Sequence, residues 1–117
     1  MMLDWNNYRT LVQGGVVDIA KASPDIVRGY REMSNAGNAK NVLGAKTREL
    51  IALAVAVTRQ CDGCITIHMK AAIDQGATRD EIIETLGVAV SVNAGAALVF
   101  STRAMDAYAA IVPPAAP

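Results

Sequence analysis

The stretch from Thr47 to Lys70 reads TRELIALAVAVTRQCDGCITIHMK and decides the fold class. Its first half carries eight consecutive apolar residues from Leu50 to Val57, more than one amphipathic stripe requires, and this predicts a central helix over 47–60. Its second half predicts another helix from about 62 to 75, ended by Gly76 in a left-handed conformation. Because no stretch shows sustained alternation of apolar and polar residues, we predict an all-α protein.

Helix signals continue on both sides of this stretch. Upstream, Ser23-Pro24-Asp25 is typical of a helix start and predicts a helix to about residue 34, preceded by a weaker helix over 4–21. The segment 35–44, NAGNAKNVLG, is predicted to be a loop.

Downstream, Thr78-Arg79-Asp80-Glu81 predicts a capping box at the start of another helix. We expect that helix to bend or break around Asn93-Ala94-Gly95 and a final helix to reach about residue 111. Residues 1–112 are therefore interpreted as a single domain, and 113–117 as a flexible tail.

Composition narrows the classes of partner. The 117 residues include 11 basic and 11 acidic side chains, so no net charge attracts nucleic acid. The start, MMLDWNNYRT, lacks the pattern of a secretory signal, which favours a reducing cytoplasm. The uncharged run 85–102 is as long as a minimal membrane span, but polar residues and glycines interrupt it. We interpret it as a buried or subunit-facing segment and expect no membrane partner.

The chain's two cysteines and its one histidine lie close together in the sequence. On a helix with 100° per residue, Cys61, Cys64 and His68 occupy an arc of roughly 60° on one face. A thiol of pKa about 8.5 is only about 3% ionised at pH 7, and a helix N-terminus contributes only about 0.3–1 kcal/mol toward ionising it. Reactive thiolate chemistry therefore needs a base, and His68 is the candidate.

A carboxylate is available to orient that base. If 47–60 and 62–75 form an antiparallel hairpin, Glu49 lies within roughly 7 Å of His68 along the axis, a gap that the glutamate and one water can span. A carboxylate next to a thiol raises its pKa, whereas one behind an imidazole raises its basicity, so Glu49 is expected to contact His68. Two other interpretations remain open: zinc bound by the two cysteines, His68 and Glu49, and incidental burial of the cysteines.

The sequence from Arg48 through Met69, with its spacing of Glu49, Cys61, Cys64 and His68, resembles the AhpD-like alkylhydroperoxidases of the carboxymuconolactone decarboxylase superfamily. The resemblance continues more loosely to about Ala107. It implies a helical bundle with the C-x-x-C at the start of a central helix. It also implies a homo-oligomer, a trimer or hexamer, that reduces organic hydroperoxides without a bound cofactor and is recycled by an external dithiol, dihydrolipoamide-like or thioredoxin-like.

The resemblance also assigns roles to the two cysteines. It makes Cys64 the peroxidatic residue and Cys61 the resolving one, whereas proximity to the helix N-terminus favours Cys61 as the nucleophile. We follow the resemblance because Cys64 is one helical turn from His68. Gly63 departs from the family pattern, in which a second histidine precedes the second cysteine. The alternative functions are a carboxymuconolactone decarboxylase-like lactone enzyme and a zinc-binding, non-catalytic module.

Overall fold

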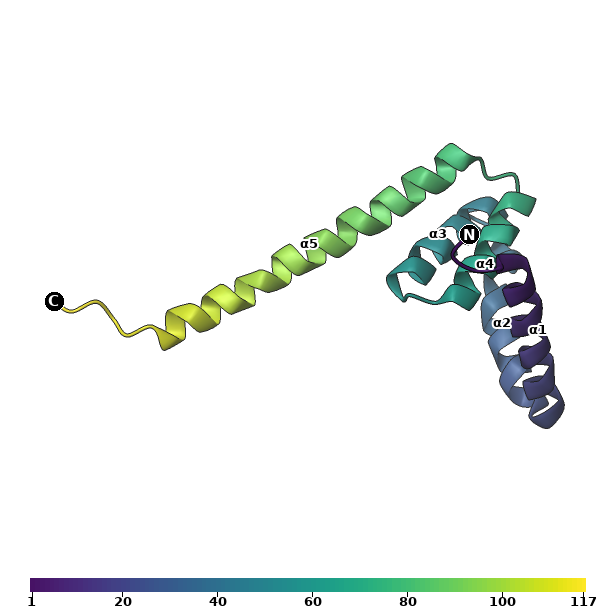
Figure 1. Ribbon diagram of the computed structural model, residues 1–117, viewed down its shortest axis with the longest axis horizontal. Coiled ribbons are helices and arrows are strands. Elements are labelled where there is room, and N and C mark those ends of the chain that lie inside the picture. Colours follow the sequence, from purple (N-terminus) through teal and green to yellow (C-terminus); the bar gives the residue numbers. More distant parts are fainter.

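The computed structural model describes all of residues 1–117 and contains five α-helices and no strand. The helices are α1 (Trp5–Ala22), α2 (Pro24–Lys40), α3 (Ala45–Thr58), α4 (Asp62–Asp74) and α5 (Arg79–Ile111). The all-α prediction is confirmed. Helices α1 to α4 form a cluster, and α5 leaves that cluster as a long rod with the C-terminus at its far end (Figure 1).

Helix α2 is longer than the sequence predicts. It begins at Pro24 as expected, but it continues to Lys40, so the predicted loop over 35–44 is wrong for most of its length. The Arg48 guanidinium of α3 donates to the side-chain oxygens of Asn38 (3.0 Å) and Asn41 (2.8 Å). These asparagines are thereby prevented from competing with the helix for backbone hydrogen bonds. Asn41 then ends the helix in the left-handed conformation.

Helices α3 and α4 form the predicted antiparallel hairpin. Leu53 of α3 is fully buried, as expected for the central apolar run. The turn depends on Gln60, whose φ of 54° is left-handed although the residue is not glycine. This conformation lets the Cys61 N–H donate to the Ala56 carbonyl at 3.1 Å and closes the end of α3. Gly76, with φ of 85°, follows α4 as predicted.

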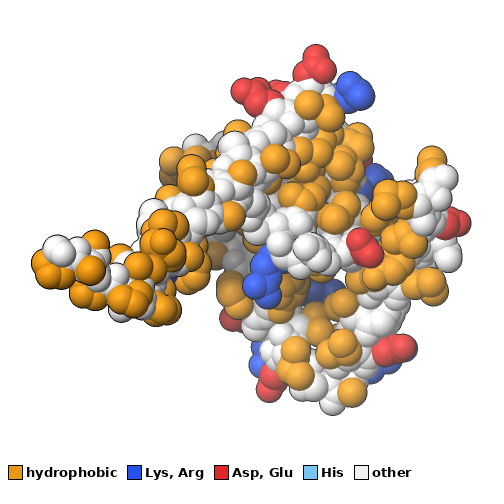
Figure 2. Space-filling model, turned by 60° about the vertical axis from the view of Figure 1, so that its left-hand side comes forward, with side chains coloured by type: hydrophobic (Ala, Val, Ile, Leu, Met, Phe, Trp, Pro, Cys, Tyr) orange, Lys and Arg blue, Asp and Glu red, His pale blue; other side chains and the backbone are white.

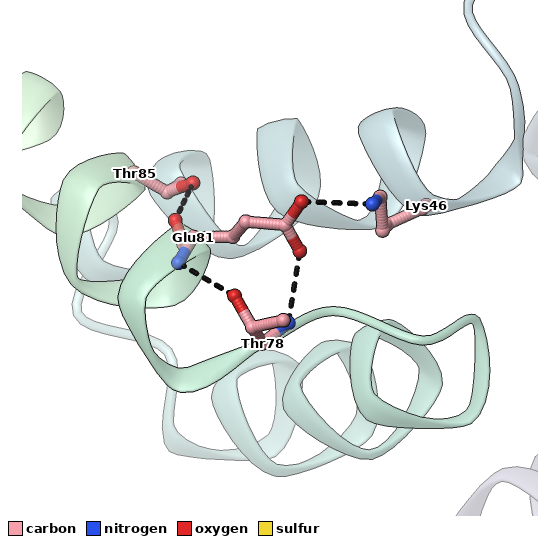
Figure 3. Close-up of polar contacts among 4 residues, drawn as sticks. All are labelled: Lys46, Thr78, Glu81 and Thr85. Atoms are coloured by element: carbon pink, nitrogen blue, oxygen red, sulfur yellow. Dashed lines mark hydrogen bonds and ion pairs between the residues drawn. The ribbon is translucent and has the colours of Figure 1, made fainter.

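The start of α5 is fixed by the predicted capping box (Figure 3). The Glu81 N–H donates to the Thr78 hydroxyl at 3.1 Å, and the Glu81 carboxylate accepts from the Thr78 N–H at 2.8 Å. The same carboxylate pairs with Lys46 of α3 at 2.8 Å, so the cap also connects the two helices. The Lys46 ammonium and the Thr78 N–H lower the pKa of Glu81.

The predicted bend in α5 around residues 93–95 is absent, because the helix is continuous over 33 residues. The Asn93 amide donates to the Ala89 carbonyl (2.7 Å) and to the Thr58 hydroxyl of α3 (2.9 Å), so it supports the helix instead of interrupting it. Gly95 alone costs a helix only about 1 kcal/mol, and no proline is present to break it.

The chain buries little of its own surface. Only six of the 117 residues are buried, and the radius of gyration is 20.4 Å, against about 13 Å for a compact domain of this length. The accessible surface is 9075 Å², whereas a compact 12.3 kDa monomer exposes about 6,100 Å². Hydrophobic side chains cover much of the projecting part of the molecule (Figure 2).

Candidate active site

The C-x-x-C motif lies at the first turn of α4, as the sequence predicts. Cys61 is the N-cap residue, and its sulfur accepts a hydrogen bond from the Cys64 N–H at 3.2 Å. Sulfur therefore occupies the position in which serine or aspartate oxygens usually cap a helix. An N-cap acceptor bears negative charge favourably because the unpaired N–H groups of the helix point toward it.

Hydrogen bonding divides the two thiols into a stronger and a weaker acid. The Cys64 side chain donates to the Cys61 sulfur, and this bond, with the Cys64 N–H, lowers the pKa of Cys61. The same side-chain bond raises the pKa of Cys64, and desolvation adds to the increase. The pair loses its first proton as a unit, and the resulting charge lies mainly on Cys61. This geometry supports the helix-end argument for a Cys61 thiolate.

Glu49 and His68 form the direct contact that the hairpin geometry makes possible. The Glu49 carboxylate lies 2.8 Å from Nδ1 of His68, and both side chains are about one quarter exposed. No intervening water is needed at this distance. The contact fixes the ring and leaves Nε2 as the nitrogen available for proton transfer. On the opposite face of α4, Lys70 pairs with Asp74 at 2.6 Å and takes no part in this arrangement.

All four predicted residues line one open cavity of about 850 Å³. Helix α4 contributes Cys61, Cys64 and His68, and α3 contributes Glu49, while α1 and α2 supply most of the remaining wall. The resemblance to known proteins is carried by residues after the N-terminal segment, but that segment builds about half of the cavity wall. Helical spacing in the sequence could have indicated this contribution. Val12 and Val16 lie on one face of α1, and Val27 and Tyr30 lie on one face of α2.

The structure does not bring metal-binding side chains together into a preformed site. No three histidine, cysteine or acidic side chains are grouped so that they could hold a metal ion. The zinc interpretation needs at least three such ligands at a common distance from one point. The geometry instead groups the residues in two pairs, Cys61 with Cys64 and Glu49 with His68.

Gly63, which replaces the family's second histidine, lies beneath α1. A Cβ at this position would be 3.5 Å from a Val12 methyl group and 4.0 Å from the Tyr8 ring, which is ordinary contact. A larger side chain would have to displace one of these residues or turn away from them. A small residue at position 63 thus lets α1 pack against the C-x-x-C motif.

We predict that Gly63→Ala is tolerated and that Gly63→His is not. The alanine methyl group fits within van der Waals distance, whereas the imidazole overpacks the contact with α1 and should cost about 1–3 kcal/mol of unfolding free energy. Urea denaturation of both variants measures the difference. Equal stability of the histidine and alanine variants would contradict this account of α1 packing.

These features define a class: an all-α protein with a C-x-x-C dithiol at a helix N-terminus and a glutamate–histidine pair in the same cavity. The sequence model that describes the carboxymuconolactone decarboxylase family matches residues 24–107 of this chain. The chain belongs to the carboxymuconolactone decarboxylase family, as the sequence resemblance predicts.

Several known proteins are similar to this chain over most of its length, and one of them is a solved structure of the same family. An uncharacterized protein of Haemophilus influenzae is 41% identical over 108 residues, which is 92% of this chain and 96% of that protein. "Uncharacterized protein 4 in cox locus" of Paracoccus denitrificans is 35% identical over 75% of this chain and 79% of its own length. The apo crystal structure of a carboxymuconolactone decarboxylase family protein from Legionella pneumophila superposes with a TM-score of 0.73 at 33% identity, covering 89% and 93% of the two chains.

Proposed function

We propose that this protein is a thiol-dependent peroxidase that reduces organic hydroperoxides through the Cys61–Cys64 dithiol. The observation that supports this function best is the convergence of the dithiol and the Glu49–His68 pair on one cavity. The lowered pKa of Cys61 increases the fraction of this thiol that is ionised at a given pH, and the thiolate is the reactive form. The mainly apolar cavity wall suits an organic hydroperoxide better than hydrogen peroxide.

The reaction begins with proton redistribution within the dithiol. The resting charge lies on Cys61, so Cys64 becomes the attacking thiolate when its proton moves to Cys61 or to His68, one helical turn away. The Cys64 sulfur attacks the terminal peroxide oxygen and the O–O bond breaks. The departing alkoxide takes the proton that Cys64 gave to Cys61 or His68 and leaves as an alcohol, so Cys61 is again a thiolate. Cys64 is then a sulfenic acid.

The second half of the cycle closes and reopens a disulfide. The Cys61 thiolate attacks the Cys64 sulfenic acid and releases water, so the dithiol and one hydroperoxide yield a disulfide, an alcohol and water. An external dithiol, such as dihydrolipoamide or thioredoxin in a reducing cytoplasm, reopens the disulfide by two exchange steps. Glu49 holds His68 in position throughout, and no step requires a bound cofactor.

Counting thiols tests this function directly. The native reduced protein should lose two titratable thiols on addition of one equivalent of cumene hydroperoxide and regain both with dihydrolipoamide. Unchanged thiols after a large excess of hydroperoxide would eliminate the peroxidase function. The lactone alternative would then be tested by assaying decarboxylation of a carboxylated lactone, and the zinc alternative by measuring bound zinc in the purified protein.

We predict that His68→Ala slows oxidation of the dithiol by roughly 100-fold or more, because general acid–base catalysis typically contributes 10²–10⁴-fold. Glu49→Gln should have a smaller effect, since this residue acts through His68. Stopped-flow kinetics of thiol loss measure both rates. The matched control is Lys70→Ala on the opposite face of α4, which should retain the wild-type rate. A wild-type rate in His68→Ala would remove the histidine from the mechanism.

We further propose that the working form is a homo-oligomer, a trimer or hexamer. The chain exposes about 3,000 Å² more surface than a compact monomer of its mass. A standard interface buries only about 800 Å² per partner, so the excess suits more than one interface on each subunit. Helix α5 contributes much of it, with Leu98, Val99 and Phe100 each at least two thirds exposed.

A bilayer is the other environment that could cover α5. Its most apolar 18-residue window has a mean hydropathy of 1.7 and is 6% buried, so the helix is long and apolar enough to cross a membrane. However, Asn93, near the middle of the uncharged run 85–102, bonds to Thr58 at the end of α3. A membrane-spanning α5 would therefore bring the neighbouring Arg59 to mid-bilayer depth, where an arginine costs about 2.5–3.5 kcal/mol or more. This cost favours burial of the apolar surface of α5 against other subunits over burial in a bilayer.

A further inference from the structure

Arg31 is the unpaired charge on the wall of the active-site cavity. It lies on α2, on the face that also presents Val27, Tyr30 and Ser34 to the cavity. Its guanidinium makes no hydrogen bond or ion pair within the chain, whereas Arg28, nearly one turn earlier, pairs with Asp25. Arg28 does not line this cavity. The two arginines therefore share a helix but differ in both pairing and position.

The other charged side chain on the lining is already occupied. Glu49 holds His68 at 2.8 Å, so its charge is directed at the imidazole. The rest of the wall is mainly apolar, with Val12, Val16 and Ile26 among its residues. A ligand that matches this lining has a hydrocarbon body and one anionic group. Among anions, a carboxylate suits a guanidinium especially well because the two can form parallel, bidentate hydrogen bonds.

We propose that the preferred substrates are apolar hydroperoxides that carry a carboxylate, such as hydroperoxides of long-chain fatty acids, and that Arg31 binds the carboxylate. The inference rests on the proposed peroxidase function and names its substrate class. Arg31 is a specificity-determining residue here, since it contacts the part of the substrate that does not react. The peroxide end is reduced at Cys64 as for any other hydroperoxide.

A matched substrate pair tests the inference: a hydroperoxide of linoleic acid and its methyl ester, assayed below the concentration at which either aggregates. The wild-type protein should show a kcat/KM about fivefold higher for the acid, as expected for one solvent-exposed ion pair worth up to about 1 kcal/mol. Arg31→Gln should lower the kcat/KM for the acid to about that for the ester and so remove this preference, and Arg31→Lys should retain part of it. Arg28→Gln is the control and should keep the full preference.

Binding separates this inference from the proposed function. The corresponding hydroxy acid and its methyl ester cannot be reduced, so their dissociation constants, measured by calorimetry, do not depend on catalysis. Tighter binding of the acid that is lost in Arg31→Gln supports the inference even if neither hydroperoxide is reduced. Equal turnover and equal binding of acid and ester by the wild-type protein would overturn it while leaving the peroxidase function intact.

Discussion

Replacing Cys64 by alanine should abolish peroxide turnover and raise the pH at which Cys61 is alkylated. Turnover is lost because a single sulfur cannot form the intramolecular disulfide. The alkylation profile moves because the Cys64 side chain is the main donor that lowers the pKa of Cys61. Iodoacetamide labelling from pH 5 to 10, with mass spectrometry of the labelled peptide, measures the second effect. Cys64→Ser is the matched control, since its hydroxyl remains a donor and should shift the profile less.

The roles of the two sulfurs can be read from the reciprocal variant. In Cys61→Ala, peroxide should oxidise Cys64 to a sulfenic acid that persists, because no resolving thiol is present, and dimedone should label it. The wild-type protein should therefore alkylate first at Cys61 but become oxidised at Cys64. Dimedone labelling of Cys61 in Cys64→Ala, with no peroxide consumption by Cys61→Ala, would exchange the two roles and favour the helix-end argument over the family resemblance.

The parts of the site that the sequence predicts well are those within one hairpin. Cys64 and His68 lie on α4 and Cys61 is its N-cap residue, so helix geometry places the two helical residues and the cap adjoins them. Glu49 lies on the adjacent helix, so its position depended only on the length of one turn. The distance of 2.8 Å between the Glu49 carboxylate and Nδ1 of His68 is shorter than the sequence predicts. The rise per residue fixes the offset of the two residues along the helix axes, but it does not fix the rotation of α3 about its own axis.

The parts that the sequence does not predict involve contacts between distant segments. The loop expected over 35–44 is mostly helix because Arg48 binds its asparagines, and local propensity contains no information about that partner. Similarly, Asn93 was interpreted as a helix breaker, but its amide bonds to Thr58 across the α3–α5 contact. Polar residues that favour turns in isolation are stabilised within helices when another element satisfies their side chains.

Replacing Leu98 by glutamate should dissociate the oligomer and lower Tm by roughly 10 °C or more. Leu98 is 75% exposed within one chain and lies in the C-terminal half of α5. If other subunits cover it, the substitution buries an unpaired charge at several equivalent positions. Leaving a buried charge without its partner costs about 3–5 kcal/mol, and we expect a cost of similar size here. Each kcal/mol of lost stability lowers Tm by about 4–8 °C in a small domain.

Light scattering measures the assembly and calorimetry measures Tm, with Leu98→Met as the control that keeps the apolar volume. Hydrogen exchange adds a test that needs no substitution. The C-terminal half of α5 has few contacts within the chain, so its amides exchange rapidly in a monomer and slowly where other subunits cover the helix. A monomeric wild-type protein with rapidly exchanging α5 amides would contradict the oligomer. If the α5 amides exchange slowly only when lipid vesicles are present, the apolar surface of α5 is covered by a membrane and not by other subunits.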